Sequence, residues 1–558
     1  MALSNSKDLE EKLERERRAA EEKDAERRAK KNNLPYLDLI SVSVPTEIEA
    51  MALVPESHAK DGLLVPLQLI QRKLVVAVFD PTLETTSKIL GELKQKYEVG
   101  LYVTSLSGLK HAWKHYEYVA DQKEIAGKVE IDQENLATLT REIKTFDEFA
   151  SRVRSFDKPR TTELLEVILA GALALKASDV HLEPNEKQGV IRLRVDGVLH
   201  DIEKDFPTSR YHAVISRIKL LSNLKINIQT EPQDGRFTIA LKNKSIEVRT
   251  SIIPSEYGET AVMRVLDPES LKTNLSDLGL REDDFKILKE EIGRPNGLIL
   301  NTGPTGSGKT TTLYAILKAL SSPRVKIITI EDPIEYHLPG ISQTQVRPEA
   351  SYTFASGLRS ILRQDPDVIL VGEIRDKETA EIALNASLTG HLVLSTLHTN
   401  DAVGAIPRLI DLDAKPQIIG PGLNLVISQR LVRVVCIHCR KKSPISSVLN
   451  KKINEFVRAL PDRVNKDGFD APHLYEAAGC EKCTSIGYKG RTSIFEFFQV
   501  TKEIETAIYK NPNEIELKDL ANSQEMVTMQ EDGIIKTLLG ITTFDEVERL
   551  TGKISWLH

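Results

Sequence analysis

The sequence has no long hydrophobic run, few aromatic residues and few cysteines. Aromatic residues make up 5% of its 558 positions, and only four cysteines and two tryptophans occur. Because no apolar run approaches the roughly 18 residues of a spanning helix, no transmembrane segment is predicted. The N-terminus also lacks the apolar core of a signal peptide, so we expect a cytoplasmic protein.

The charge balance argues against a protein that binds nucleic acid over its whole surface. The net charge is −6, with 75 Lys and Arg against 81 Asp and Glu. This balance argues against bulk affinity for nucleic acid, although a local basic patch is not excluded. The hydrophobic fraction of 41% is ordinary for a globular protein. The length is too great for one core and predicts three or four domains.

The clearest motif is GPTGSGKT, which fits the pattern G-x-x-x-x-G-K-[ST]. An apolar run typical of a buried strand precedes it, and apolar residues at helical spacing follow it. The glycines let backbone N–H groups turn toward a phosphate, and the helix N-terminus adds partial positive charge. Lys309 would reach the β and γ phosphates of ATP, and the Thr310 hydroxyl would ligate Mg²⁺. The predicted nucleotide-binding residues are Gly303, Pro304, Thr305, Gly306, Ser307, Gly308, Lys309, Thr310 and Thr311.

Three apolar runs downstream of this loop each end in an acid or a histidine. VKIITI precedes Glu335, VILV precedes Glu373, and HLVLSTL precedes His398. In an open parallel sheet, ligands bind at the carboxyl ends of the strands. We therefore expect these three residues at the nucleotide site. Glu373 could activate water as well as contact the metal, and His398 could sense the γ-phosphate or be structural.

The four cysteines form two C-x-x-C pairs, Cys436 with Cys439 and Cys480 with Cys483. Four thiolates suffice for a tetrahedral zinc site, provided that the long intervening segment folds back as a lobe. Disulfides are disfavoured in the cytosol, and no βαβ pattern frames either pair as a redox site. A structural Zn²⁺ site with no open coordination position is therefore predicted.

Two arginines lie in apolar strands of the region 160–270, namely Arg249 and Arg264. An arginine on an apolar strand needs a carboxylate, a phosphate or open water. From the residues alone, a structural ion pair is the favoured interpretation for both. In the same region, the glycine-containing segments PQDGR (232–236) and SEYGE (255–259) predict sharp turns.

The N-terminal part of the chain carries no catalytic motif. Residues 1–31 are mostly charged with mixed signs and predict an exposed helix, for which a solvated extension is favoured over a tether to a partner. Residues 32–120 predict a small α/β domain without nucleophile, metal cluster or glycine loop, so a docking role is expected. Residues 121–150 are polar and charged, which predicts a linker with some helix.

In order along the chain, GPTGSGKT, ITIEDPIEY, RQDPDVILVGEIRD and GHLVLSTLHTN resemble the Walker A, Asp box, Walker B and His box of the secretion ATPase superfamily. The segments SDVHLEP, PQDGR and YGE–AVMRVLD and the cysteine pairs make the chain similar to type II secretion and type IV pilus assembly ATPases. This resemblance implies a multidomain α/β fold. A PAS-like domain (151–272) would carry the arginines, and a RecA-like ATPase domain (273–558) would include the cysteine lobe at about 430–490.

The resemblance also implies a function and partners. The protein would be a homohexamer that hydrolyses ATP to power pilus assembly or type II secretion. It would lie at the inner face of the cytoplasmic membrane through a polytopic platform protein and a cytoplasmic docking protein. In the family, arginines corresponding to Arg249 and Arg264 reach a neighbouring subunit's nucleotide. Residues 32–119 lack the R-L-G-containing repeat that binds a cyclic dinucleotide in some relatives, so that ligand is not predicted.

Two other classes of protein share part of this pattern. A nucleic-acid translocase has a similar hexameric motor but needs a basic pore loop with aromatic residues, and the sequence shows no such stretch. A nucleotide-gated scaffold without turnover would not need Lys309, Glu335 and Glu373 together.

Overall fold

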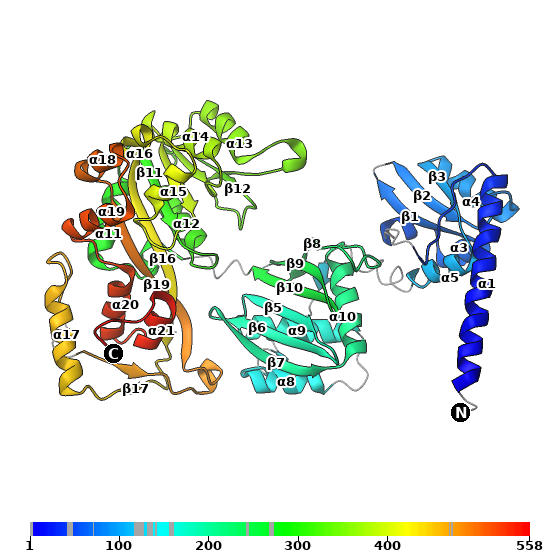
Figure 1. The fold of residues 1–558 in the computed structure, drawn as a ribbon, viewed down its shortest axis with the longest axis horizontal. Helices are drawn as coiled ribbons and strands as arrows, with labels where there is room; N and C mark the ends of the chain where they lie inside the picture. The colour runs from blue at the N-terminus through cyan, green and yellow to red at the C-terminus, as the bar shows by residue number, and fades with distance from the viewer. Residues whose placement is uncertain are drawn as a thin grey trace. The chain divides into compact units, whose positions relative to one another are not determined.

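The computed structural model is a multidomain α/β protein, which confirms the predicted fold class (Figure 1). The chain divides into two compact units, Met1–Leu266 and Asp267–His558. The structure describes residues 4–557 except 42–47, 71, 117–127, 131–137, 140–141, 156–160, 242–244, 267–272, 468 and 470–471. Among the described helices, none is both long and apolar enough to cross a bilayer.

The N-terminal domain contains a three-stranded sheet in the order β1-β2-β3, with β1 and β2 antiparallel and β2 and β3 parallel. Aliphatic residues of β1 and β2 form the centre of its core, together with residues from the surrounding helices and connections. The strands and helices are β1 (Leu64–Ile70), β2 (Lys73–Val78), β3 (Glu98–Val103), α2 (Ile48–Met51), α3 (Glu56–Asp61), α4 (Glu84–Lys94) and α5 (Leu106–Trp113).

Helix α1 (Ser4–Lys31) is the charged helix that the N-terminal sequence predicts. Its C-terminal half is packed on the N-terminal domain, because Ala29 is buried (2% exposed) within that domain's apolar core. Glu22 accepts hydrogen bonds from the Tyr36 and Ser105 hydroxyls, each at 2.7 Å. This half of α1 is therefore not a solvated extension, contrary to the favoured expectation. The small side chain of Ala29 lets the helix approach the domain closely, and the Glu22 carboxylate fixes it by its two hydrogen bonds.

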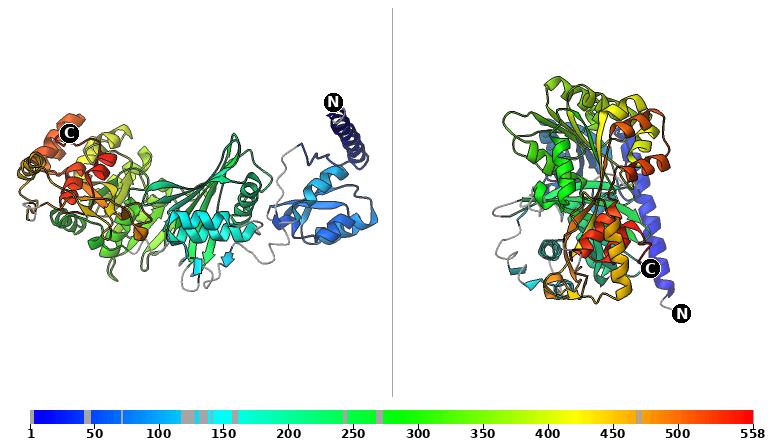
Figure 2. Two further views of the ribbon diagram at one scale, coloured as in Figure 1. Left: turned by 90° about the horizontal axis from the view of Figure 1, so that it is seen from below. Right: turned by 90° about the vertical axis from the view of Figure 1, so that its left-hand side faces the viewer.

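The second domain has a seven-stranded sheet in the order β4-β8-β9-β10-β5-β6-β7. Buried and half-buried residues alternate along β6, as expected for a strand with one face against helices (Figure 2). The strands and helices are β4 (Lys128–Glu130), β5 (Asp179–Pro184), β6 (Gly189–Val195), β7 (Val198–Phe206), β8 (Gln233–Ala240), β9 (Ser245–Ser255), β10 (Gly258–Leu266), α8 (Phe146–Arg154), α9 (Thr161–Ala174) and α10 (Thr208–Leu221).

The segment expected to be a linker contributes to this domain. Strand β4 pairs with β8, and α8 begins at Phe146 with a capping box from Thr145 and Glu148. Strand β4 falls within the range 121–150 and α8 begins within it, while 121–127, 131–137 and 140–141 lie outside the described residues.

One of the two predicted turns is wrong. The PQDGR segment is not a turn, because β8 begins at Gln233 and continues through Gly235. A Cβ on Gly235 would lie 2.4 Å from the carbonyl oxygen of Ser222, so the glycine permits close backbone approach within a strand. The SEYGE turn is confirmed between β9 and β10.

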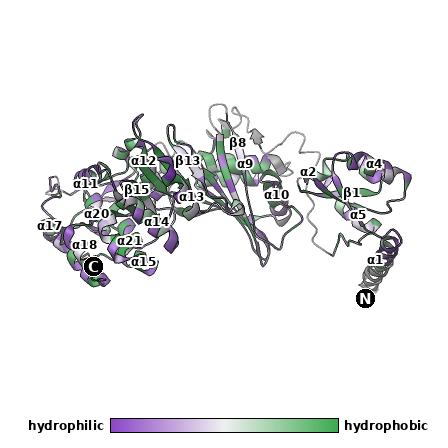
Figure 3. Ribbon diagram, turned by 90° about the horizontal axis from the view of Figure 1, so that it is seen from above, coloured by the Kyte–Doolittle hydropathy of each residue, from purple (hydrophilic) through white to green (hydrophobic). Residues whose placement is uncertain are grey.

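The second unit is built on a seven-stranded sheet in the order β13-β12-β14-β15-β11-β16-β19, parallel except for the pair β16–β19. Strands β11, β12, β14 and β15 are buried at every residue, which is typical of a parallel sheet covered on both faces (Figure 3). The strands are β11 (Gly297–Thr302), β12 (Ile327–Glu331), β13 (Ser342–Gln345), β14 (Val368–Val371), β15 (Leu392–Leu397), β16 (Leu423–Val435) and β19 (Tyr488–Gln499).

Helices cover both faces of this sheet. Successive residues of β11 enter different apolar clusters, since Leu298 and Leu300 belong to one cluster and Ile299 to the other. The helices are α11 (Glu282–Ile292), α12 (Lys309–Leu320), α13 (Phe354–Ile361), α14 (Lys377–Leu388), α15 (Ala405–Asp411), α16 (Pro416–Gly422), α18 (Lys502–Tyr509) and α19 (Glu514–Ser523).

A lobe is inserted between β16 and β19, and two C-terminal helices pack on it. Apolar residues of the lobe and of these helices share one core, which includes Ile453 and Leu460 from the lobe and Ile535 from the first helix. The elements are β17 (Lys441–Lys442), α17 (Ser447–Ala459), β18 (Tyr475–Glu476), α20 (Met529–Leu538) and α21 (Phe544–Thr551).

Candidate functional site

The predicted phosphate loop lies between β11 and α12, in the strand–loop–helix order that its motif requires. Gly303, Gly306 and Gly308 have φ angles of 141°, 80° and 92°. L side chains rarely adopt this conformation. Gly303 meets a second constraint, since a Cβ there would lie 2.6 Å from the carbonyl oxygen of Gln429. The glycines are therefore required by the shape of the loop.

The predicted nucleotide-binding residues form one continuous segment. Pro304, Thr305 and Gly306 are exposed at the tip of the loop, whereas Thr310 and Thr311 are half-buried on the first turn of α12. The loop consists of Gly303, Pro304, Thr305, Gly306, Ser307 and Gly308, and the helical turn begins with Lys309, Thr310 and Thr311.

Lys309 folds back over the loop. Its Nζ donates hydrogen bonds to the carbonyl oxygens of Gly303 (2.7 Å) and Pro304 (3.1 Å). Burial lowers the pKa of Lys309, and the nearby Glu373 carboxylate acts in the opposite direction. The ammonium group therefore contacts the loop at the positive end of α12 and lies within electrostatic range of Glu373.

Glu373 lies two residues beyond the end of β14, and its side chain is 14% exposed. Its carboxylate pairs with Arg375 and lies 3.6 Å from Nε2 of His398, which follows β15. Arg375 also reaches Asp332 after β12, with 3.8 Å between Nη1 and Oδ2. Side chains from the carboxyl ends of three neighbouring strands therefore meet beside Lys309.

The electrostatics of His398 place it in the same cluster. Burial lowers the pKa of His398, and the positive charge of Lys309 lowers it further. The Glu373 carboxylate opposes this shift. The neutral imidazole is therefore favoured near neutral pH, with a ring nitrogen available to donate or accept a hydrogen bond.

Glu335 lies on the loop after β12, next to α12. Burial and the Glu331 carboxylate are the main causes that raise the pKa of Tyr314 on α12, and a backbone hydrogen bond with Glu335 acts in the opposite direction. Glu331 itself is 3% exposed and accepts hydrogen bonds from the Tyr314 hydroxyl and from Gln343 Nε2 (3.2 Å). The acid that ends β12 is therefore structural, and a catalytic role for Glu335 stays a prediction.

The two predicted arginines lie in one row across the sheet of the second domain. Arg249 on β9 is directly opposite Arg236 on β8 and Arg264 on β10. Arg264 is in turn opposite Asp179 on β5, which is opposite Arg194 on β6. Three arginines thus stand side by side on adjacent strands. Such a row concentrates positive charge and favours an anion above it.

Each predicted arginine has a carboxylate neighbour. Nε of Arg264 lies 2.9 Å from Asp179, and Nε of Arg249 lies 3.1 Å from Glu247. The ion pairs favoured by the sequence are therefore present. Both arginines belong to the first unit and the phosphate loop to the second, so their role toward a nucleotide stays a prediction.

The two C-x-x-C pairs meet in the lobe. The four Sγ atoms lie within 4.8 Å of one another. Cys480 and Cys483 are 3.7 Å apart, as are Cys439 and Cys483, and Cys436 lies 4.0 Å from Cys480. A tetrahedral ion with Zn–S bonds of about 2.3 Å would hold its sulfurs about 3.8 Å apart. The cluster therefore fits a metal ion such as zinc.

Motif spacing alone does not identify every residue of the site. At the nucleotide site, Arg375 pairs with Glu373 and with Asp332, although neither Arg375 nor Asp332 is among the predicted catalytic residues. The signal for both is their place in the sequence, since Arg375 stands two residues after Glu373 and Asp332 follows β12. Gln429, which touches the loop glycines, comes from β16 and has no signal in the nucleotide motifs.

A glycine loop at the carboxyl edge of a parallel sheet, with acid and histidine beside its lysine, defines the class of P-loop ATPases. The family described as Type II/IV secretion system protein matches residues 155–549. The chain belongs to this family, which confirms the resemblance found in the motifs. Residues 32–123 match a second family, described as the MshEN domain.

The chain has relatives among type II secretion system proteins and among type IV pilus assembly ATPases. The chain is 46% identical over 390 residues to type II secretion system protein E of Dickeya dadantii, covering 70% of this chain and 75% of that protein. It is 37% identical over 525 residues to the type IV pilus assembly ATPase PilB of Myxococcus xanthus, covering 93% and 89%. These relatives give no support to the alternative of a nucleic-acid translocase.

A solved structure shares the fold. The ATPase DotB of Legionella pneumophila superposes with a TM-score of 0.51 at 22% identity, covering 71% of this chain and 97% of that one. At this identity, the likeness concerns the fold.

Proposed function

We propose that this protein is an ATP-hydrolysing motor that powers type II secretion or type IV pilus assembly and works as a homohexamer. The observation that carries the proposal is the cluster of Lys309, Glu373 and His398 beside the phosphate loop. This cluster combines a cation for the phosphates with an acid and a histidine that would face the γ-phosphate. A binding scaffold without turnover would need only the first of these.

The phosphate loop and α12 would hold the triphosphate. Lys309 now donates to two loop carbonyls, and a bound phosphate would accept the same hydrogen bonds. Thr310, on the first turn of α12, and the acids at the strand ends fit a Mg²⁺ ion, which would neutralise charge on the β and γ phosphates. Glu335 would support the metal side of the site.

Glu373 would orient the attacking water and accept its proton. Arg375 and His398 hold its carboxylate from two sides, so its direction is fixed before substrate binds. His398, neutral near pH 7, would donate a hydrogen bond to the γ-phosphate and report its loss.

Arg249 and Arg264 would close over the nucleotide of a neighbouring subunit. Arg264 has 54% of its side chain exposed and is accessible to an anion. An arginine supplied to a phosphoryl-transfer site is worth about 10³–10⁵ in rate. Hydrolysis would weaken this contact and allow the second domain to move.

The cysteine lobe would hold one structural Zn²⁺ per chain. Four protein ligands leave no open coordination position, so the site would stabilise the lobe and take no part in hydrolysis.

The N-terminal domain would dock to the membrane machine. Partners of the expected kinds are a polytopic inner-membrane platform protein and a cytoplasmic docking protein, which would hold the motor at the inner face of the membrane. A transport or pilin assembly assay in a strain that lacks the native motor would assign the client.

The proposal predicts the behaviour of Lys309→Ala. Removing the ammonium should abolish ATP turnover while the protein still folds, because the contacts of Nζ are to the loop itself. Phosphate release and thermal unfolding would be measured together. Lys318→Ala removes the same charge from the last turn of α12 and should leave turnover unchanged. If Lys309→Ala keeps most of the activity, the phosphate-loop assignment is wrong.

A further inference from the structure

A buried glutamine on β16 contacts the residues on both sides of the phosphate loop. Gln429 on β16 is 1% exposed. Its Oε1 accepts hydrogen bonds from Thr312 Oγ1 (2.8 Å) and Asn301 Nδ2 (3.1 Å). Asn301 lies on β11 and Thr312 on α12, so one amide oxygen joins the strand before the loop to the helix after it.

The loop is shaped around this glutamine. A Cβ on Gly303 would lie 2.6 Å from the Gln429 carbonyl oxygen, and one on Gly308 would lie 2.8 Å from its Nε2. The first and last glycines of the loop therefore rest directly on Gln429. Any change in the position or polarity of Gln429 would therefore change the conformation of the phosphate-binding backbone.

The other end of the amide leads to helix α20. Gln429 Nε2 donates to Ser493 Oγ (2.9 Å) on β19. The carbonyl oxygen of Ser493 accepts from Lys536 Nζ (2.6 Å), which also pairs with Asp532 one turn earlier on α20 (2.6 Å). Lys536 and Asp532 are both buried. A continuous series of buried polar contacts thus runs from the phosphate loop to α20.

A second buried side chain links α20 to the loop that carries His398. Glu496 on β19 is 5% exposed. Its carboxylate accepts from the backbone N–H of Ala402 (2.8 Å) and from that of Met529 (3.2 Å). Ala402 is four residues beyond His398, and Met529 is the first residue of α20. One carboxylate therefore holds the histidine loop and the start of α20 together.

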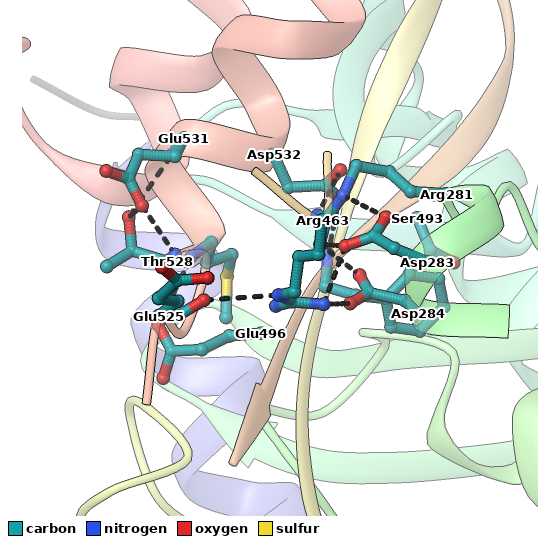
Figure 4. Close-up of polar contacts among 12 residues, drawn as sticks. Arg281, Asp283, Asp284, Arg463, Ser493, Glu496, Glu525, Thr528, Glu531 and Asp532 are labelled. Carbon is teal, nitrogen blue, oxygen red and sulfur yellow. Dashed lines mark hydrogen bonds and ion pairs between the residues drawn. The ribbon is translucent and has the colours of Figure 1, made fainter. Parts of the chain in front are cut away.

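Helix α20 faces the lobe on its other side. Ile534, Ile535 and Leu538 belong to the core that the lobe shares with the C-terminal helices. Asp532 also pairs with Arg281 (2.9 Å), which pairs with Asp284 (2.7 Å). Figure 4 shows these groups converging with Arg463, which belongs to the lobe and lies 3.3 Å from Asp284.

We infer that Gln429 and Glu496 are positioning residues that fix the two walls of the nucleotide site to α20. Gln429 sets the phosphate loop, and Glu496 sets the loop that carries His398. The inference rests on the proposed ATPase function. It extends the nucleotide site beyond its motifs, to a helix near the C-terminus that contacts the lobe.

The first test is Gln429→Met in the full-length protein. Methionine matches the size of glutamine but leaves Asn301, Thr312 and Ser493 without their shared partner. An unsatisfied buried group costs enough to weaken ATP binding about ten-fold, measured as the Kd of a fluorescent ATP analogue. The turnover number at saturating ATP should fall by less than about three-fold, because the groups around the γ-phosphate are untouched.

The second test is Glu496→Gln. The amide can accept from one of the two N–H groups, and its own NH₂ then faces the other. The turnover number should fall about ten-fold while the Kd for the analogue stays unchanged, because the carboxylate joins the His398 loop to the start of α20 and does not contact the phosphate loop. The two variants thus predict opposite effects on binding and turnover, which general destabilisation would not produce.

Matched controls come from one hydrogen-bonded pair that joins β19 to a helix on the face of the same sheet. Gln499 on β19 donates to Glu291 on α11 (3.1 Å), and burial raises the pKa of both Glu291 and Glu496. Gln499→Met and Glu291→Gln repeat the two changes away from the phosphate and histidine loops. They should lower the melting temperature without changing Kd or turnover number. If Gln429→Met does not fold, Ser493→Ala removes a single contact and should weaken binding about three-fold.

The outcomes are separable. Opposite shifts in the Gln429 and Glu496 variants, absent from the controls, support the inference. Kd and turnover values equal to those of the controls overturn it while leaving the ATPase intact. If the wild-type protein neither binds nor hydrolyses ATP, the proposed function fails, and this inference fails with it.

Discussion

At the scale of single residues, the direction of the Glu373 carboxylate is the main determinant of the proposed chemistry. Arg375 and His398 contact it, and Lys309 lies close enough to influence it electrostatically. The carboxylate is largely buried among cations and a neutral imidazole. It is therefore oriented without nucleotide, and no rearrangement is needed before it meets a water molecule.

Replacement of Glu373 separates binding from hydrolysis. Glu373→Gln keeps the shape and removes the charge, so ATP should still bind while turnover falls by about 10²–10⁴, the range for a general base. Nucleotide binding and phosphate release would be measured on one preparation. Glu378→Gln, an exposed acid on α14, should behave as the wild type. Loss of binding in Glu373→Gln would identify a structural residue and not a base.

At the scale of elements, the lobe depends on four thiols that come from two distant segments. Cys436 and Cys439 follow β16, and Cys480 and Cys483 precede β19. The lobe's apolar core is shared with α20 and α21, so a bound metal and this core would together define its fold. Losing one ligand opens a closed site whose binding energy is folding energy.

The metal prediction follows from this arrangement. Protein purified without chelator should contain about one zinc ion per chain, and Cys480→Ser should lose it. Hydrogen exchange should then rise in the lobe around 436–483, while the phosphate loop keeps its protection. Lys482→Gln changes a residue between the ligands without removing a thiol and should retain zinc. Elemental analysis that finds no zinc in the wild-type protein would refute the site.

At the scale of the whole molecule, the proposed catalytic groups are divided between two compact units. Arg249 and Arg264 lie in the first unit, and Lys309 and Glu373 lie in the second. If the arginines act on a neighbouring subunit, each complete site needs two chains. Turnover per chain should then fall on dilution, as the assembly dissociates.

A mixing experiment tests this division. Lys309→Ala chains retain the arginines, and Arg249→Ala/Arg264→Ala chains retain the phosphate loop. Each should be inactive alone, and mixed assemblies should recover part of the wild-type turnover. Lys309→Ala mixed with Glu373→Gln is the control. Both defects lie in the second unit, so every site in the mixture contains one defective phosphate-binding or catalytic residue, and no activity should return. If the test mixture recovers no activity and dilute wild-type monomer is fully active, sites shared between subunits are excluded.

Much of the second unit could be predicted because its signals are local. The glycines of GPTGSGKT set the backbone of the loop, and the apolar runs before Glu373 and His398 become buried parallel strands. Parallel strands end at one edge, so these side chains had to meet. The cysteine pairs are similarly informative, because four thiols in two C-x-x-C pairs supply the ligands of a tetrahedral metal site.

Other features depend on contacts between residues that are far apart in the sequence. Gly235 has the appearance of a turn residue, yet its role is close approach to the Ser222 carbonyl oxygen within a strand. The charged pattern of α1 does not reveal that Ala29 and Glu22 pack on the N-terminal domain. Gln429 is an unremarkable glutamine in an apolar strand until β16 is placed beside β11.

The sequence by itself determined the phosphate loop, the buried strands that precede the acid and histidine residues, and the family. Those properties arise from local backbone preference and from residues spaced closely along the chain. Only the tertiary structure decided which acids face Lys309, which arginines share a row, and how Gln429 and Glu496 connect both loops to α20. These contacts join residues up to 128 positions apart, as between Asn301 and Gln429. No local pattern encodes such a contact, because it exists only when the chain has folded and excluded water from between the two groups.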